Sequence, residues 1–305
     1  MIARARKFFS SSFQQPIGAH VEEGAVRGYH IDMRVKARRS GWPEAWPWAP
    51  GEQSWISLAQ LGLGAHERWI AGEGEEWLVL AGHVGDVLVE HQVEGGTRDG
   101  AWEQRFDVPH TYELRAPWIS AMAQGEGASL LVRLHAVTSE ERYAEAAARA
   151  LRPLAVPSAE GGTAALLDGR PFPQEYPTSP PSFVLNGGIF AMWGWYDVAI
   201  ALGDAAARSA FEDAVETLAL NLHRWDTGWW SLYDLYPHRR PNPASFAYHE
   251  LHIAQLQAMH RIAPRPELAQ TAERFARYER SPWGRGRAFA NKAAFRLTVP
   301  RRRPA

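Results

Sequence analysis

The sequence predicts an all-α fold, a toroid of helical hairpins that resembles an (α/α) barrel, and three observations lead to this class. Apolar residues recur at helical spacing in long segments along most of the chain. Stretches rich in Pro and Gly separate these segments into pairs at fairly even intervals. Strand patterns are few, so we expect β-structure only as small β-hairpins in the loops. Repeated helical hairpins with long loops favour a toroid over a bundle, with the loops gathered at one end.

The expected helices follow one another in pairs. In chain order they are 53–70, 75–93, 119–137, a helix opened by Ser139, 182–202, a helix opened by Asp204, 244–262 and 266–280. Ser139 and Asp204 are predicted N-caps, because a short polar side chain there accepts a hydrogen bond from the first helical turn. The stretches 95–118 and 156–182 are rich in turn residues and are expected to be loops.

The chain is expected to fold as one helical domain with an irregular N-terminal segment packed on it. Its 305 residues are many for an ordinary domain, but toroids reach this size. Residues 1–52 include GWPEAWPWAPGE, in which Pro, Gly and Trp disfavour helices. We therefore place the boundary at residue 52 and the helical-hairpin domain at 53–305.

Composition excludes several classes of function. A net charge of −1 offers no electrostatic basis for binding nucleic acid or an anionic membrane surface. The absence of cysteine excludes disulfides, thiolate metal sites and a cysteine nucleophile. The basic start MIARARKFF is followed by serines instead of a signal-peptide apolar region, and no run approaches the ~20 apolar residues of a membrane span. We expect a cytoplasmic protein without a transmembrane segment.

Aromatic and cationic residues suit a carbohydrate ligand. The chain has 14 Trp, and the alternatives for each are core packing or a groove that receives the C–H faces of sugars. Lysine occurs only at positions 7, 36 and 292, so arginine supplies most of the positive charge. Guanidinium groups suit bidentate binding of carboxylate or sulfate.

A first candidate segment is QEYPTSPPSFVLNG, at 174–187. Pro177 favours an extended conformation at Tyr176, so Glu175 and Tyr176 point in opposite directions from a constrained loop. A carboxylate and a phenol presented in this way can contact two sides of a bound ring. The alternative is a Pro-rich lead-in to a helix, with a tyrosine that only packs.

A second segment is WDTGWWSLYDL, at 225–235. Asp226-Thr227-Gly228 indicates a turn after a helix. If the following run is extended, Trp230, Leu232 and Asp234 share one face, and Ser231, Tyr233 and Leu235 share the other. An aspartic-protease interpretation of DTG is rejected, because that chemistry needs a mostly-β scaffold and a second carboxylate.

A third segment is NPASFAYHELHIAQL, at 242–256. On a helix, Tyr248 and His252 share a face at i and i+4. His249 and His252, at i and i+3, would form half of a metal site. Because no third ligand has a clear spacing, we predict no metal and expect histidines that are satisfied by hydrogen bonds.

These three segments resemble the C-terminal domain of the heparosan and heparan glucuronyl C5-epimerases. The order and the gaps are those of the family, and SAMAQG at 120–125 matches the segment that opens that domain. ISLAQLGLG at 56–64 is similar to a more N-terminal family motif. The resemblance covers residues 117–280 well and is patchy before them.

The resemblance implies the site residues and the reaction. Glu175, Tyr176, Tyr233 and Tyr248 match the catalytic Glu-Tyr pair and the two tyrosines of the family. The expected substrate contacts come from Arg239, Arg240, Asn186, His249, His252, Gln124 and Trp230. The implied activity is inversion of C5 of D-glucuronic acid to L-iduronic acid in a polysaccharide, without a cofactor. The implied partner is an anionic, uronate-containing glycan such as heparosan or heparan sulfate, and the family precedent suggests a homodimer.

This chemistry needs what the four residues offer. The C5 hydrogen of a uronate is α to its carboxylate, so its removal builds charge onto the carboxyl group, which needs donors or cations there. Inversion also needs a base on one ring face and a proton donor on the other. We expect Glu175 and Tyr248 to flank C5, while Tyr176 and Tyr233 hold the carboxylate.

Two departures from the family pattern bear on the substrate. Tyr236 stands where vertebrate members have an arginine, and Arg239 or Arg240 is the candidate replacement. The vertebrate β-rich domain between the ISLAQ-like and SAMAQG-like segments has no room in this chain, so a calcium site in that domain is not implied here.

Two rival functions stay open on sequence alone. A polysaccharide lyase abstracts the same C5 proton, expels the C4 substituent and leaves an unsaturated uronate. A non-catalytic glycan-binding protein would keep the fold and an aromatic groove but lose the ionisable set.

Overall fold

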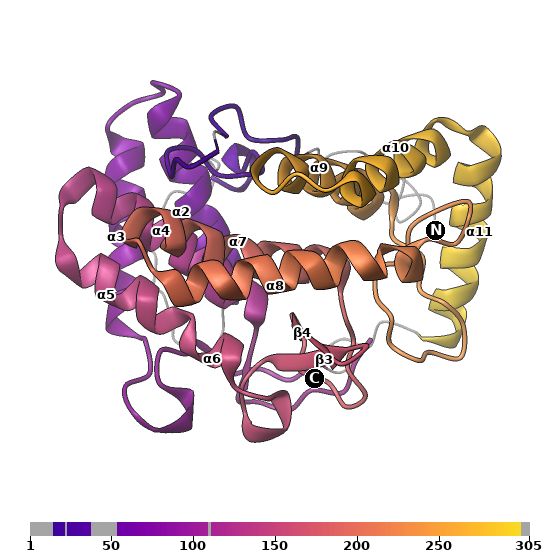
Figure 1. Cartoon of the computed structure of the whole chain (residues 1–305), viewed down its shortest axis with the longest axis horizontal. Helices are drawn as coiled ribbons and strands as arrows, with labels where there is room; N and C mark the ends of the chain where they lie inside the picture. The colour runs from indigo at the N-terminus through magenta and orange to yellow at the C-terminus, as the bar shows by residue number, and fades with distance from the viewer. Residues whose placement is uncertain (1–14, 22, 38–53, 109–110, 300–305) are drawn as a thin grey trace.

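Helices form most of the computed structural model, which describes residues 15–21, 23–37, 54–108 and 111–299 (Figure 1). The helices are α2 (Trp55–Ile70), α3 (Glu76–Glu90), α4 (Ala121–Thr138), α5 (Glu141–Ala150), α6 (Arg152–Ala155), α7 (Leu185–Leu202), α8 (Ala205–Asn221), α9 (Phe246–Ile262), α10 (Pro266–Arg280) and α11 (Pro282–Thr298). The expected boundary at residue 52 falls within 38–53, outside the described residues.

The helices pack as hairpins in two layers. α2 pairs with α3, α4 with α5, α7 with α8, and α9 with α10. The first helices of these pairs contact one another in turn, from α2 through α4 and α7 to α9, and form the inner layer. The second helices form the outer layer, as α8 in front of α7 shows (Figure 1). This is the arrangement of hairpins that the sequence pattern predicted.

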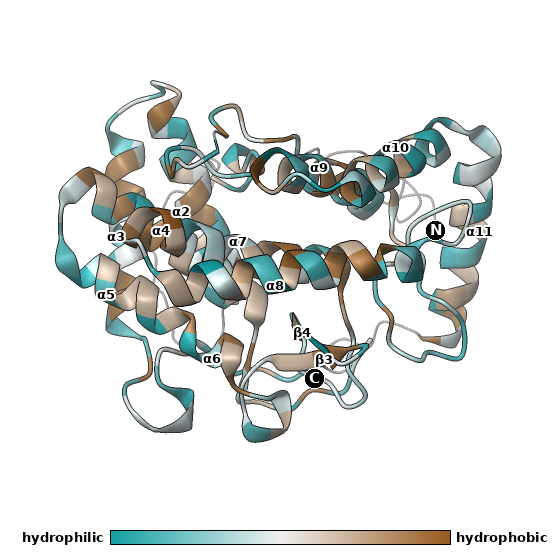
Figure 2. Cartoon of the chain, in the orientation of Figure 1, coloured by the Kyte–Doolittle hydropathy of each residue, from teal (hydrophilic) through white to brown (hydrophobic). Residues whose placement is uncertain are grey.

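The inner layer owes its close packing to small residues. α7 is buried from Leu185 to Ala199, and α4 from Ala121 to Leu134. Where the two helices cross, a Cβ on Gly125 would lie 2.5 Å from Cα of Ala191. These inner helices therefore have no face open to solvent, whereas an outer helix such as α8 shows both hydrophilic and hydrophobic residues along its length (Figure 2).

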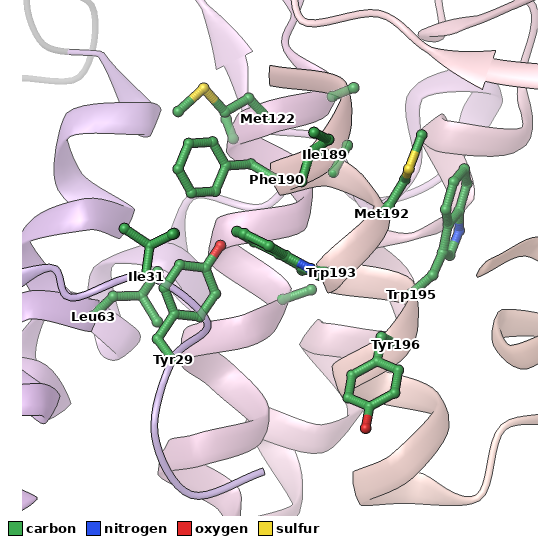
Figure 3. Close-up of a cluster of buried hydrophobic side chains, with 14 of the residues drawn as sticks. Tyr29, Ile31, Leu63, Met122, Ile189, Phe190, Met192, Trp193, Trp195 and Tyr196 are labelled. Carbon is green, nitrogen blue, oxygen red and sulfur yellow. The ribbon is translucent and has the colours of Figure 1, made fainter. Parts of the chain in front are cut away.

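The described part of the N-terminal segment packs against the inner helices. Tyr29 and Ile31 are fully buried beside Phe190 and Trp193 of α7 (Figure 3). The ring centroids of Tyr29 and Trp193 are 5.8 Å apart in an edge-on arrangement. Residues 28–31 therefore contribute to the same core as the helical hairpins.

A buried polar network holds the backbone of this segment. Arg133 of α4 donates to the carbonyl oxygen of Gly28 at 2.7 Å and to Oδ2 of Asp197 at 2.6 Å. His30 hydrogen bonds to the other oxygen of Asp197 at 2.9 Å. Burial raises the pKa of Asp197, but Arg133 and His30 outweigh burial and lower that pKa to about 2. The segment is thus tied to α4 and α7 by a charged pair that water does not reach.

Two small β-hairpins stand in the loops, as expected. β1 (Glu103–Gln104) pairs with β2 (Trp118–Ile119), and β3 (Ala164–Leu167) pairs with β4 (Arg170–Pro173), both antiparallel. Asp168 and Gly169, between β3 and β4, both have positive φ, as in a two-residue hairpin turn of type I′. β4 leads directly into the loop that carries Glu175.

Helix ends agree with the sequence in part. Asp204 is confirmed as the N-cap of α8, where its carboxylate accepts from the backbone N–H of Ala207 at 2.9 Å. The prediction for Ser139 is wrong: its φ of 60° ends α4 in the left-handed conformation, and Glu140 is the N-cap of α5. A Pro-rich entry delays α7 to Leu185, and α11 was not expected at all. None of the helices in the described residues combines the length and the apolar character of a membrane span.

Candidate active site

Backbone hydrogen bonds bring the three candidate segments together at the start of α7. Tyr233 O accepts from the N–H of Leu185 at 3.1 Å, and Ser182 O accepts from the N–H of Leu235 at 2.9 Å. The N–H of Tyr233 donates to Asn242 O at 2.8 Å, which attaches the third segment to the second. The 231–235 run therefore lies between the 174–187 loop and the segment that begins α9.

Gln174 shapes the loop that presents Glu175 and Tyr176. Its fully buried side-chain oxygen accepts from the backbone N–H of Ser182 at 2.9 Å and of Phe183 at 3.1 Å. These bonds close the Pro-rich loop into a compact turn at the end of β4. Sequence reasoning did not select Gln174, although it stands at the start of the first candidate segment.

Glu175 is a buried carboxyl group, with only 4% of its surface exposed. It lies against the first turn of α7, where a Cβ added to Gly187 would be 2.2 Å from its Oε2 atom. That oxygen has no hydrogen-bond partner among the described residues. Burial raises the pKa of Glu175 to about 8, although a hydrogen bond with Tyr176 opposes this shift. A carboxyl group with such a pKa exchanges protons near neutral pH.

Three tyrosines lie near this carboxyl group. Tyr176 is close enough to Glu175 and Tyr233 for both to affect its pKa, and the rings of Tyr233 and Tyr248 meet edge to face with centroids 4.9 Å apart. Burial raises the pKa of both Tyr176 and Tyr233, and the charge of Glu175 adds to the rise. Tyr248, in the first turn of α9, is 40% exposed. The four predicted catalytic residues thus form one cluster, which reaches solvent at Tyr248.

A fourth tyrosine, Tyr112, supports this cluster from the loop between β1 and β2. Its ring centroid is 4.9 Å from that of Tyr176, and its hydroxyl donates to Oδ2 of Asp234 at 2.5 Å. Asn242 donates to the same oxygen at 2.6 Å. Asp234 therefore ties the β1–β2 loop to the segment that carries Tyr233. Sequence reasoning missed Tyr112, because it lies in a turn-rich stretch without regular spacing.

Lys292 of α11 places a buried cation beside the cluster. Its ammonium group donates to Oδ1 of Asn242 at 2.7 Å and to the carbonyl oxygen of Pro243 at 2.8 Å. The same nitrogen is 5.8 Å from the ring centroid of Tyr233. Sequence reasoning missed this residue too, since α11 lies beyond the last expected helix, and the rarity of lysine is a weak signal.

The two histidines of the third segment lie behind the cluster. His249 and His252 are fully buried, and Nδ1 of each contacts the hydroxyl oxygen of Ser231, at 2.7 Å and 2.9 Å. Nε2 of His249 is 3.0 Å from the carbonyl oxygen of Phe275, which assigns the proton to that nitrogen and makes Nδ1 an acceptor. Burial lowers the pKa of His249 to about 3, so its imidazole is neutral. The described residues hold no group of three or more acidic or histidine side chains arranged for a metal ion.

Two of the other predicted contacts are enclosed by the protein. Trp230 is fully buried and donates to Ala244 O at 3.0 Å, so no face of its indole is open to a sugar. Gln124 is also fully buried, and its side-chain amide bonds to backbone groups of Gly100, Trp102 and Ala150. These two residues pack in this structure because their neighbours enclose them completely, which sequence spacing does not reveal.

Asn186, Arg239 and Arg240 differ in their relation to the cluster. Asn186 is buried in the first turn of α7 next to Gly187, and its side-chain oxygen has no partner among the described residues. Arg239 and Arg240 are exposed in the loop after Tyr236. The arrangement as a whole offers a buried carboxyl group, phenols on several sides and a nearby cation. Such a set can remove a proton from one side of a ring and supply one to the other.

Sequence comparison gives the site its context. A family described as D-glucuronyl C5-epimerase C-terminus matches residues 96–277, which include all four residues of the cluster. The chain belongs to this family. The resemblance found in the three segments is thereby confirmed, and it now rests on a continuous match over more than half of the chain.

Two curated proteins illustrate the relationship. The D-glucuronyl C5-epimerase of Caenorhabditis elegans is 35% identical over 212 residues, which are 63% of this chain and 34% of the worm protein. An uncharacterized protein of Methanocaldococcus jannaschii is 30% identical over 162 residues, which are 51% of this chain and 50% of the archaeal protein. These matches span between a third and a half of the length of the two relatives.

Solved structures show the fold. A variant of UGL with dGlcA-Glc-Rha-Glc aligns with a TM-score of 0.50 at 17% identity, over 73% of this chain and 61% of that one. The unsaturated glucuronyl hydrolase from Bacillus sp. GL1 aligns over the same shares of the two chains, also at 17% identity, with a TM-score of 0.47. The likeness to the first structure confirms the all-α toroid class.

Proposed function

We propose that this protein inverts C5 of D-glucuronic acid residues within a polysaccharide and so produces L-iduronic acid. The observation that carries the proposal is the placement of Glu175 within one cluster with Tyr176, Tyr233 and Tyr248. The family match supports the same reaction, because its printed description is that of a glucuronyl C5-epimerase.

The proposed roles follow from burial and position. Glu175, with a pKa of about 8, exchanges the C5 proton on one face of the uronate ring. Tyr248 is the exposed member of the cluster and exchanges a proton on the opposite face. Tyr176 and Tyr233 donate hydrogen bonds to the carboxylate of the uronate, where negative charge develops when the C5 proton leaves. The proton that one face loses is replaced on the other, so the reaction is balanced without an oxidant.

The proposed substrate is an anionic, uronate-containing glycan, with heparosan as the first to test. A buried Lys292 beside Tyr233 supports an anionic ligand at this position, because opposite charges attract strongly where water is scarce. A homodimer and a cytoplasmic location stay predictions from the sequence.

Incubation with heparosan in deuterated water tests the reaction. We expect deuterium at C5 together with iduronate, measured by NMR. Ultraviolet absorbance of an unsaturated uronate, without iduronate, would identify a lyase instead. Binding of heparosan with neither product would favour a glycan-binding protein.

Variants of the tyrosines test the roles. Tyr176→Phe and Tyr248→Phe each remove one hydroxyl from the cluster, and we expect C5 exchange to fall by about 100-fold or more, the usual contribution of a positioned acid or base. Tyr143→Phe is the matched control, because the Tyr143 hydroxyl bonds to Asp86 on the outer helices. Unchanged exchange in both cluster variants would disprove this mechanism.

A further inference from the structure

Trp283, in the first turn of α11, is a large apolar side chain that the fold leaves in contact with solvent. It is 65% exposed, whereas most tryptophans in the described residues are buried. Arg287 follows one turn later on the same side of the helix, and its guanidinium carbon is 5.0 Å from the Trp283 ring. The helix therefore presents an aromatic ring and a cation together at the surface.

Trp229 completes this surface group from the other side. The Arg287 guanidinium carbon is 4.6 Å from the Trp229 ring, so two indoles flank one cation. α11 is seated directly on this segment, since a Cβ on Gly284 would lie 3.3 Å from Trp229 O. In residues 15–21, 23–37, 54–108 and 111–299, Arg287 has these ring contacts but no ion pair. Its side chain is held in place while its charge stays available to a ligand.

The group lies close to the catalytic cluster. Trp229 precedes Tyr233 by four residues, which separates their Cα atoms by at most about 14 Å. Trp229 and Tyr233 also pack against the same small core of Trp230, Ala244, Phe246 and Ala288. A short oligosaccharide that occupies the cluster can therefore reach the indoles with its next sugars.

The chemistry of the group selects its ligand. Indole faces suit the apolar C–H faces of pyranose rings. A guanidinium beside them suits a carboxylate, which it binds with two parallel N–H donors. We propose that Trp229, Trp283 and Arg287 form a subsite for a uronate residue of the glycan chain, adjacent to the catalytic cluster. This subsite rests on the proposed function and deepens it, because it makes affinity depend on the length of the chain. Trp283 and Arg287 lie beyond the segment that matches the family, residues 96–277.

Calorimetric binding of two heparosan oligosaccharides tests the subsite. The wild-type protein should bind a decasaccharide more tightly than a disaccharide, which is too short to span the cluster and the indoles together. Trp283→Ala and Arg287→Met should each raise the Kd of the decasaccharide by about tenfold, the size of one stacking or charge-assisted contact, and leave the Kd of the disaccharide unchanged. Both side chains are exposed, so the fold should survive either change. Arg277→Met, which removes an exposed cation from α10, is the control and should alter neither Kd.

Each other outcome overturns the subsite. The subsite is wrong if both variants bind the decasaccharide as tightly as the wild-type protein does. It is also wrong if the variants lose the same affinity for both oligosaccharides, or if the wild-type protein does not bind the decasaccharide. The result is separable from the reaction itself. If deuterium enters C5 and the variants bind the decasaccharide with the wild-type Kd, the proposed epimerase activity is supported and the subsite is refuted. Length-dependent binding that the variants lose, without deuterium at C5, would retain the subsite and refute the epimerase.

Discussion

Gly187 leaves the space that the carboxylate of Glu175 occupies. The Cβ of any other residue at this position would be 2.2 Å from Oε2 and 2.7 Å from Cδ of Glu175. The helix that begins the third pair of the toroid is thus shaped at its first turn to receive the buried acid.

Replacing Gly187 by alanine should displace Glu175 and reduce C5 exchange. A misplacement of about 1 Å at a reacting group lowers the rate by roughly 100-fold, whereas overpacking destabilises the fold by about 1–3 kcal/mol. Deuterium incorporation and thermal unfolding measure the two effects separately. Gly82→Ala in α3 is the control, because a Cβ there meets nothing within 4 Å. Full activity in Gly187→Ala would show that the position of Glu175 is not critical.

The proton exchange at Glu175 should give the reaction a defined pH dependence. Inversion needs one of the two groups that flank C5, Glu175 and Tyr248, to be ionised and the other to be protonated. The forward reaction starts with the proton on one of these groups, and the reverse reaction starts with it on the other. Burial raises the pKa of Glu175 to about 8. We therefore expect kcat/KM to increase as the pH is raised from about 6 to 8, for the forward reaction and for the reverse reaction alike. Deuterium exchange measured from about pH 6 to 9 tests this.

Glu67 provides the control for that profile. Burial also raises its pKa, to about 7, but Glu67 accepts a hydrogen bond from the backbone N–H of Tyr29, on the inner face of α2. Glu67→Gln should leave the pH profile unchanged, and Glu175→Gln should abolish the exchange. A profile that is flat between pH 6 and 9, or that Glu67→Gln shifts, would assign the ionisation to another group.

Loss of the Lys292 ammonium should weaken both the fold and the activity. Lys292→Met keeps a long side chain but removes the donor to Asn242 and to Pro243 O, which we expect to destabilise the protein by about 1–3 kcal/mol. The shift of the segment that holds Tyr233 should lower kcat, as measured by C5 exchange. Asn291→Met, one residue earlier on the exposed side of α11, should change neither quantity. A wild-type kcat in Lys292→Met would show that Lys292 does not support the position of Tyr233.

The buried pair of Arg133 and Asp197 should matter for stability more than any surface ion pair. Arg133→Met leaves the Asp197 charge without its partner at 2.6 Å, and we expect a loss of about 3 kcal/mol or more in urea unfolding. The double variant Arg133→Met with Asp197→Leu, which removes both charges, should lose less free energy of unfolding than Arg133→Met alone. Arg142→Met breaks half-exposed pairs with Asp86 and Glu140 and should stay within about 0.5 kcal/mol of wild type. Equal effects of Arg133→Met and Arg142→Met would contradict this view.

Local pattern accounts for the success of the helix predictions and for their errors. The period of apolar residues in 53–70 and 266–280 is a local property, and α2 and α10 match these segments closely. The failure at Ser139 has another cause, because a serine between two helices favours an N-cap, whereas the connection between α4 and α5 holds it in the left-handed conformation that glycine usually takes. α11 was missed because its glycines and arginines blur the apolar spacing.

The sequence alone predicted which residues form the cluster of Glu175, Tyr176, Tyr233 and Tyr248. Each of them stands in an ordered motif, and a candidate for proton transfer is selected by its side chain and its motif. The tertiary structure decided the surroundings of these residues. Tyr112 and Asp234 are 122 positions apart, and Lys292 and Asn242 are 50 apart, so only folding brings them together. It also decided that Trp230 is enclosed while Trp283 faces solvent, because burial depends on neighbours from distant parts of the chain and not on the identity of the residue.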